Sequence, residues 1–196
     1  MVFRIVGAVL VSLSLVSAVD ISQETAGNAL EFKSDGVILE GLNSSSTSYG
    51  WTEYKQCDSR WANEQLGTCS GTTICSAGCA MTSVAMILHT KGSGKDPSSL
   101  NKWLKNNGGY SGGCNIYWGS VDALGYTTFM GKQKASESEI CNGLAKGHGI
   151  VANVHGGSHW VLLTACKGNG VYYVNDPGYS TTTYKHSDIL EEAVYH

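Results

Sequence analysis

The residue pattern changes at Gly149, and this change most limits the folds open to the chain. Before Gly149, apolar residues recur at the spacing of helices. After it, short runs rich in Val, Tyr and Thr cover 150–155, 159–166, 171–175 and 181–184, separated by turns of hairpin length. Helices followed by antiparallel strands predict an α+β domain.

Three helices are predicted in the first part. One starts at about Cys79 and stops near Gly92, with an apolar stripe at positions 81, 84, 85 and 88. A second has Asp96 as N-cap and Pro97 as its first helical residue. The third opens with a capping box, Ser136-x-x-Glu139, and runs to Gly147. Each helix therefore has its own start or stop signal.

The N-terminus has the features of a secretory signal peptide over residues 1–18. Arg4 precedes an apolar run of about twelve residues, which is shorter than the roughly 20 needed to cross a membrane, and small residues end at Ala18. A retained anchor is the alternative. Residues 19–50 are rich in Ser, Gly and Asn and are interpreted as a pro-segment or flexible tether. The folded domain is expected over 51–196.

Composition excludes several classes of protein. Hydrophobic residues make up 42% of the 196 residues, enough to bury a core in one domain and too many for a disordered chain. Thirteen Lys and Arg against 16 Asp and Glu give a net charge of -3, with no basic block. We therefore expect neither a nucleic-acid binder nor, after signal cleavage, a membrane-bound protein, and we expect a monomer.

The number of cysteines is odd. In an oxidising compartment seven cysteines predict three disulfides and one thiol, and six paired cysteines allow fifteen connectivities. Their spacing contains no C-x2-C pair, which argues against structural zinc. The seven are Cys57, Cys69, Cys75, Cys79, Cys114, Cys141 and Cys166. The question that bears on function is which of them stays free.

Cys79 and His159 have the surroundings of a nucleophile and its base. Cys79 follows a Gly-rich turn and opens a helix, where the dipole and unpaired amide groups favour the thiolate, although a half-cystine is an equal alternative. His159 begins an apolar strand after a Gly-Gly-Ser turn. A cysteine nucleophile needs such an imidazole, usually remote in sequence, whereas a lone histidine at a strand edge more often has a structural role.

Asp176 is the third candidate. It follows the strand 171–175, which should pair with the strand that carries His159, so its carboxylate can hold the second ring nitrogen of the histidine. Asn175 should point to the opposite face. Asp-Pro-Gly is also an ordinary turn sequence. His155, four residues before His159, suggests a metal triad as an alternative, but a thiol site requires no metal.

Five blocks of sequence together resemble the C39-like cysteine peptidases of the papain-like superfamily. The likeness runs from about residue 54 to 184. The blocks, in order, are Tyr54-Lys55-Gln56-Cys57-Asp58-Ser59-Arg60-Trp61, then 77–86 around Gly78-Cys79, then Asp96-Pro97 with Leu100 and Trp103-Leu104, then Gly157-Ser158-His159-Trp160-Val161, and Asn175-Asp176-Pro177-Gly178. Their common order makes the resemblance more specific than any single block.

The resemblance implies a papain-like fold with Cys79 as nucleophile, His159 as base and Asp176 as the residue that orients the base. It also implies that Gln56 donates its amide to the oxyanion hole. One departure from the pattern is that Cys57 and Cys75 flank motif positions, which suggests an extra disulfide at the entrance to the site.

The expected function is therefore that of a secreted cysteine peptidase or amidase. It would hydrolyse peptide bonds through a Cys-His-Asp triad and an acyl-enzyme, with a peptide or a peptide-containing cell-wall polymer as substrate and no cofactor. Two alternatives remain: a hydrolase of peptidoglycan peptides, and a non-catalytic secreted binding module on the same scaffold.

Overall fold

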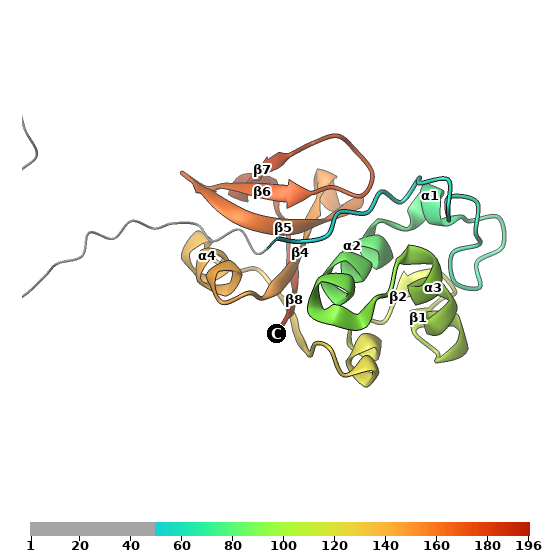
Figure 1. Ribbon diagram of the computed structural model, residues 1–196. Helices are drawn as coiled ribbons and strands as arrows, with labels where there is room; N and C mark the ends of the chain where they lie inside the picture. The colour runs from blue at the N-terminus through green and yellow to red at the C-terminus, as the bar shows by residue number, and fades with distance from the viewer. Residues whose placement is uncertain (1–49) are drawn as a thin grey trace, which may run out of the picture. The chain divides into compact units, whose positions relative to one another are not determined.

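The computed structural model describes residues 50–196 (Figure 1). The predicted signal peptide and nearly all of the predicted tether lie outside the described residues. The helical elements are α1 (Ile74–Ala77), α2 (Cys79–Leu88), the π-helical turn η1 (His89–Ser93), α3 (Pro97–Asn106), α4 (Glu137–Ala145) and the short 3₁₀ helices η2 (Trp118–Leu124), η3 (His155–Gly157) and η4 (His186–Asp188).

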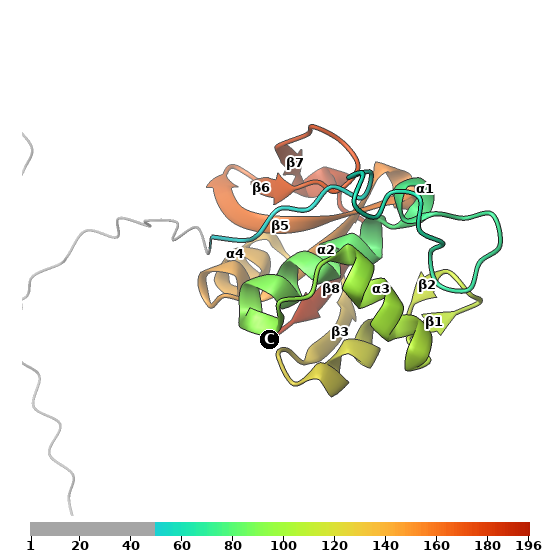
Figure 2. The ribbon, with the colours of Figure 1, turned by 45° about the vertical axis from the view of Figure 1, so that its right-hand side comes forward.

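The strands form a hairpin and a larger sheet. The hairpin consists of β1 (Tyr110–Ser111) and β2 (Asn115–Ile116). The sheet has the order β3-β8-β4-β5-β6-β7, and every neighbouring pair is antiparallel. Its strands are β3 (Phe129–Gln133), β4 (Gly149–Val154), β5 (His159–Gly168), β6 (Val171–Asn175), β7 (Thr183–Lys185) and β8 (Glu192–Tyr195). Figure 2 shows β8 and β3 behind α2.

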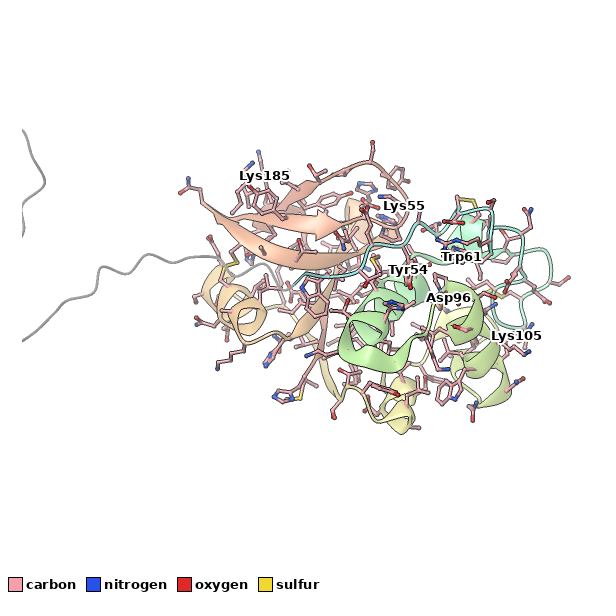
Figure 3. All side chains as sticks on the ribbon, in the orientation of Figure 1. Tyr54, Lys55, Trp61, Asp96, Lys105 and Lys185 are labelled. Carbon is pink, nitrogen blue, oxygen red and sulfur yellow. A yellow bond between two sulfur atoms is a disulfide. The ribbon has the colours of Figure 1, made fainter. Side chains whose placement is uncertain are left out.

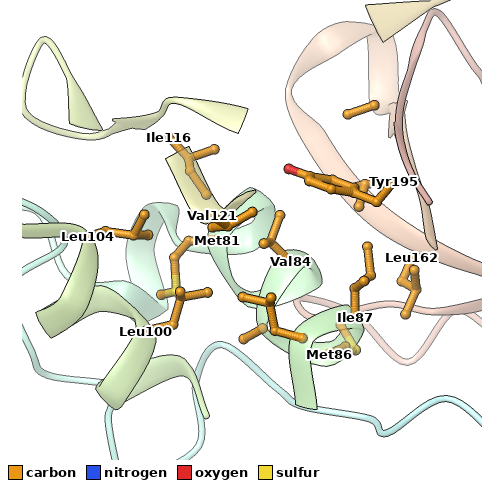
Figure 4. Packing of buried hydrophobic residues seen from close by; sticks show 14 of the residues in the cluster. Met81, Val84, Met86, Ile87, Leu100, Leu104, Ile116, Val121, Leu162 and Tyr195 are labelled. Carbon is orange, nitrogen blue, oxygen red and sulfur yellow. The ribbon is translucent and has the colours of Figure 1, made fainter. Parts of the chain in front are cut away.

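Helices cover both faces of the sheet because its central strands are apolar on both sides. Val151 and Leu162 belong to the cluster that packs on α2 and α3, as Figure 4 shows for Leu162 and Tyr195. The residues adjacent to them in the same strands, Ile150 and Leu163, point to the opposite face and belong to a second cluster with α4. The sheet is therefore held between two apolar cores, and α2 is fixed against its centre.

The α+β class predicted from the sequence is confirmed, as are the three helices and their caps. Asp96 caps α3 with Pro97 at its first position, and the Ser136 side chain closes a capping box with Glu139 at the start of α4. The four predicted strands correspond to β4, β5, β6 and β7. The prediction missed β3 and β8, the two strands on the β4 side of the sheet.

Candidate active site

Cys79 is the first residue of α2, and among the seven cysteines, all of which lie within residues 50–196, it is the one outside a disulfide. The other six form the disulfides Cys57–Cys75, Cys69–Cys114 and Cys141–Cys166. The thiol is half-buried, so a reagent or substrate can reach it. The structure thus selects Cys79 as the odd thiol, and it pairs Cys57 with Cys75, the two cysteines that depart from the family pattern.

Gly78 sets the position of this thiol. It is both the C-cap of α1 and the residue before α2, and a Cβ atom there would lie 2.4 Å from the carbonyl oxygen of Ile74. Such a distance is far shorter than any ordinary carbon–oxygen contact. The two helices can therefore meet at this angle only with glycine between them, and Cys79 is the next residue.

His159 opens β5 and faces Val154 in the ladder with β4. Its side chain is buried, and its Nε2 lies 2.7 Å from Oδ1 of Asp176. The ring is also hydrogen-bonded to the Cys79 side chain. Because Nε2 is occupied by the carboxylate, Nδ1 is the ring nitrogen left for the thiol. The structure therefore brings Cys79, His159 and Asp176 into one chain of contacts.

Opposing effects act on the charge of His159. Burial lowers the pKa of His159, but the hydrogen bonds to Asp176 and Cys79, together with the charges of these two groups, outweigh burial and raise the pKa to about 9. The imidazolium form is thus stable at neutral pH inside a largely buried site.

Asp176 is almost completely buried and accepts four hydrogen bonds. Oδ1 accepts from His159 and from the backbone amides of Gly178, at 2.9 Å, and Tyr179, at 3.0 Å. Oδ2 accepts from the Tyr184 hydroxyl at 2.9 Å. Burial alone would raise the pKa of Asp176, but these donors outweigh burial and lower it below its usual value. The carboxylate therefore stays ionised beside the imidazole.

Asn175 points elsewhere, as predicted. Its side-chain amide donates to the carbonyl oxygens of Trp51 and Thr52, each at 3.2 Å. The adjacent Asp176 turns to His159 and Tyr184. The two neighbouring residues thus serve different partners.

Gln56 is hydrogen-bonded both to the loop that follows Asp176 and to the helix that precedes Cys79. Its backbone amide donates to the carbonyl of Pro177 at 2.8 Å, and its Nε2 donates to the carbonyl of Cys75 at 2.6 Å. Its Oε1 is buried without a hydrogen-bond partner. One of the two side-chain amide hydrogens is thus used by Cys75, and the Cys57–Cys75 disulfide fixes the same two segments together.

Lys55 gives the loop after β6 a further attachment. Its Nζ donates to the carbonyl oxygens of Asp176, at 2.7 Å, and Tyr179, at 3.0 Å. Figure 3 shows the Lys55 side chain beside this loop. The segment that contains Gln56 and the loop that contains Asp176 are therefore joined by backbone and side-chain bonds.

A cleft of about 340 Å³ opens beside Cys79. Among the described residues, its lining contains no Asp, Glu, Lys, Arg or His side chain. Trp118 and Trp160 lie in its wall with their ring centroids 4.7 Å apart. One side is formed by residues 114–116 of the hairpin and the other by Gly157 and Ser158. An extended, uncharged stretch of peptide fits the chemistry of this lining.

Several contacts of the site could not be found by sequence reasoning. The sequence marks Tyr184 only as part of a strand and His155 only as a candidate metal ligand. In the structure the Nε2 of His155 lies 3.0 Å from the Tyr184 hydroxyl. Among residues 50–196 there is no cluster of three or more metal-binding side chains. The sequence carries no local signal for these contacts, because they depend on which strands lie next to each other in the sheet.

None of the helices within 50–196 has both the length and the apolar character needed to cross a bilayer. Three disulfides in so short a domain are typical of proteins that fold in an oxidising compartment.

The chain was compared with known proteins. The family model described as "Peptidase_C39 like family" matches residues 53–195, which include Gln56, Cys79, His159 and Asp176. A search of curated proteins found no match. The matched segment is most of the chain and nearly all of its described part. The chain therefore belongs to the Peptidase C39-like family, and this membership supports a peptidase.

Proposed function

We propose that this chain is a secreted cysteine peptidase or amidase that cleaves peptide bonds through an acyl-enzyme. The observation that carries the proposal is the run of contacts from Cys79 through His159 to Asp176. In it, the one free thiol meets an imidazole whose other nitrogen is held by a buried carboxylate. This is the arrangement that activates a cysteine nucleophile.

The reaction follows from these positions. The Cys79 thiolate attacks the substrate carbonyl, and the negative charge that develops on its oxygen is stabilised by the Cys79 backbone amide and by the second Nε2 hydrogen of Gln56. The His159 imidazolium then protonates the leaving amine, which releases the first product. Neutral His159 next takes a proton from water, and the hydroxide attacks the thioester and frees Cys79.

Two features support secretion. The first 18 residues have the sequence of a signal peptide, and all the cysteines except the proposed nucleophile are paired. A thiol that survives among three disulfides is expected where its reactivity is needed.

The test combines alkylation of the thiol with turnover. The protein without residues 1–18 is screened against a peptide library and against peptides cut from peptidoglycan, before and after treatment with iodoacetamide. We expect turnover that alkylation of Cys79 abolishes. His159→Ala should remove nearly all of it, whereas His148→Ala, at a half-buried histidine outside the site, should not.

The outcomes separate the candidate functions. Cleavage of peptidoglycan peptides alone would assign the cell-wall role. An absence of turnover, together with a Cys79 thiol that reacts no faster in the wild-type protein than in His159→Ala, would contradict the proposal and favour a non-catalytic binding module.

A further inference from the structure

The second oxygen of Asp176 has its own partner. Three donors converge on Oδ1, whereas Oδ2 accepts from Tyr184, at 2.9 Å, and from no other group in the described part of the chain. Tyr184 lies on β7 and is 7% exposed. The Tyr184 hydroxyl therefore holds the second oxygen of the carboxylate, so that both oxygens have donors and the orientation of the group is reinforced from two sides.

The direction of the hydrogen bonds around Tyr184 follows from counting protons. An ionised carboxylate only accepts, so the Tyr184 hydroxyl donates its one hydrogen to Asp176. Burial and the hydrogen bond to Asp176 outweigh a hydrogen bond with the Thr181 side chain and raise the pKa of Tyr184 to about 12, so the hydroxyl keeps its proton. The lone pairs of the hydroxyl then accept from the Nε2–H of His155, 3.0 Å away.

His155 adopts an unusual backbone conformation to make this contact. Its φ is +53°, and within residues 50–196 only Asn169 shares a positive φ among residues other than glycine. The left-handed region costs a side-chain-bearing residue free energy, and such strain is common at functional sites. The His155 ring is stacked on that of His159, with centroids 5.4 Å apart and an angle of 28° between the planes.

We propose that Tyr184 and His155 are positioning residues, which act in series to hold the Asp176 carboxylate in the plane that directs His159 at Cys79. This inference rests on the proposed function and adds to it a second layer of contacts behind the triad. His155 orients Tyr184, Tyr184 orients Asp176, and neither needs to touch the substrate.

The first test removes one hydroxyl. In Tyr184→Phe we expect kcat to fall about tenfold with KM unchanged, at the lower end of what a hydrogen bond to a charged group contributes. The rate of Cys79 alkylation should fall similarly, because a misdirected imidazole no longer sustains the thiolate. The alkaline limb of kcat/KM should also move to lower pH, since His159 loses part of the stabilisation that its imidazolium receives from Asp176.

Tyr172→Phe is the matched control. Tyr172 lies directly opposite Tyr184 in the β6–β7 ladder, is fully buried, and pairs its hydroxyl with a histidine, Nδ1 of His186, at 2.9 Å. Within residues 50–196 its hydrogen bond and its ring contact are both with His186 and not with the triad. This variant should therefore lose a comparable amount of stability and leave kcat and the alkylation rate at wild-type values.

The second test asks whether His155 acts through Tyr184. His155→Gln keeps an N–H donor at the reach of Nε2 and should retain most of the activity. His155→Asn tolerates the left-handed backbone but is too short to reach the hydroxyl, and should lose several-fold in kcat. Adding His155→Asn to Tyr184→Phe should cause no further loss, because residues in series are not additive.

These outcomes can be told apart from a failure of the proposed function. If wild-type Cys79 reacts fast and His159→Ala slows it, the nucleophile–base pair stands. Wild-type rates in Tyr184→Phe, an equal loss in Tyr172→Phe, or additive losses in the double variant would then overturn the positioning role alone.

Discussion

The charge of His159 depends on two neighbours rather than on exposure to water. Asp176 and Cys79 together outweigh the effect of burial and raise the pKa of His159 to about 9. In the proposed mechanism the active form pairs a thiolate with an imidazolium, so activity should be lost as pH rises through that value. By linkage, the stability that this contact contributes is full below the ordinary histidine pKa of about 6.5 and is lost through the same upper range.

The first prediction is therefore a pH profile. The value of kcat/KM should show an alkaline limb near pH 9, where His159 loses the proton that it gives to the leaving amine. Asp176→Asn removes the negative charge and should move that limb to lower pH. A limb that stays in place in Asp176→Asn would mean that the carboxylate does not set the charge of His159.

The second prediction ranks three alanine variants. His159→Ala removes the proton carrier and should lose nearly all turnover, while Asp176→Ala leaves an imidazole that is free to rotate and should keep a measurable remnant. Asn175→Ala should cost least in kcat, because its amide binds the carbonyls of Trp51 and Thr52. A larger loss in a folded Asn175→Ala than in Asp176→Ala would show that the third member is misassigned.

Much of the site could be predicted at the level of single residues. Cys79 opens a helix and His159 opens a strand, and both positions leave marks in the local sequence. The contacts of Tyr184 and His155 leave none, since they arise from the pairing of β6 with β7 and from one residue in a left-handed conformation. The pairing of the six cysteines likewise depends on distances that only the folded chain defines.

At the level of elements, the junction between α1 and α2 determines where the thiol lies. Gly78→Ala would bring a methyl group to 2.4 Å from the Ile74 carbonyl oxygen. We expect a loss of about 1–3 kcal/mol in the free energy of unfolding, as for other overpacked sites. Because the start of α2 must shift, the rate of Cys79 alkylation should fall as well.

Gly119→Ala serves as the control for this substitution. Gly119 lies in η2, and an added methyl group would make only ordinary contacts, the nearest at 3.5 Å from Phe129. It should change neither stability nor alkylation by much. If Gly119→Ala lowered stability and the alkylation rate as much as Gly78→Ala does, the junction between α1 and α2 would have no special role in placing the thiol.

The elements that sequence patterns predicted are those with strong local signals. The helices α3 and α4 begin with capping boxes, and β4 and β5 are continuous apolar runs. β3 is a largely exposed edge strand that contains Gly131 and Lys132, and β8 is a short strand that contains Glu192. Neither strand shows a clear alternation of apolar and polar residues, so its place in the sheet is set by tertiary packing rather than by intrinsic strand propensity.

For the molecule as a whole, Glu192 links stability to pH. It is 1% exposed, its Oε1 has no hydrogen-bond partner, and Oε2 accepts from the Ala135 amide at 3.0 Å. Burial raises the pKa of Glu192 above its usual value despite that bond. The folded state therefore favours the neutral carboxyl, and the stability it contributes at low pH is lost as pH rises through the raised pKa.

Glu192→Gln is the corresponding prediction. The amide stays neutral, so the variant should have a higher Tm than the wild type at about pH 8, and the difference should shrink toward about pH 4. Glu137→Gln, at a carboxylate that accepts from the Gly170 amide at 2.8 Å, should show no such gain. A difference in Tm for Glu192→Gln that is independent of pH would contradict the titration of this group.

The Cys57–Cys75 bond joins the segment of Gln56 to the turn before the nucleophile, while Cys79 must remain unoxidised. Peroxide converts a thiolate to sulfenic and then sulfinic acid, and a strong dithiol opens the neighbouring disulfide. We expect turnover to rise as dithiothreitol reduces a sulfenic Cys79 and to fall once it opens Cys57–Cys75. The paired variant Cys57→Ala/Cys75→Ala should start at a lowered turnover and lose less at high dithiothreitol, where only Cys69–Cys114 and Cys141–Cys166 are left to open. The protein would then be active only within a limited range of redox potential. Above that range oxidation blocks the Cys79 thiol, and below it reduction of Cys57–Cys75 loosens the segment that holds Gln56.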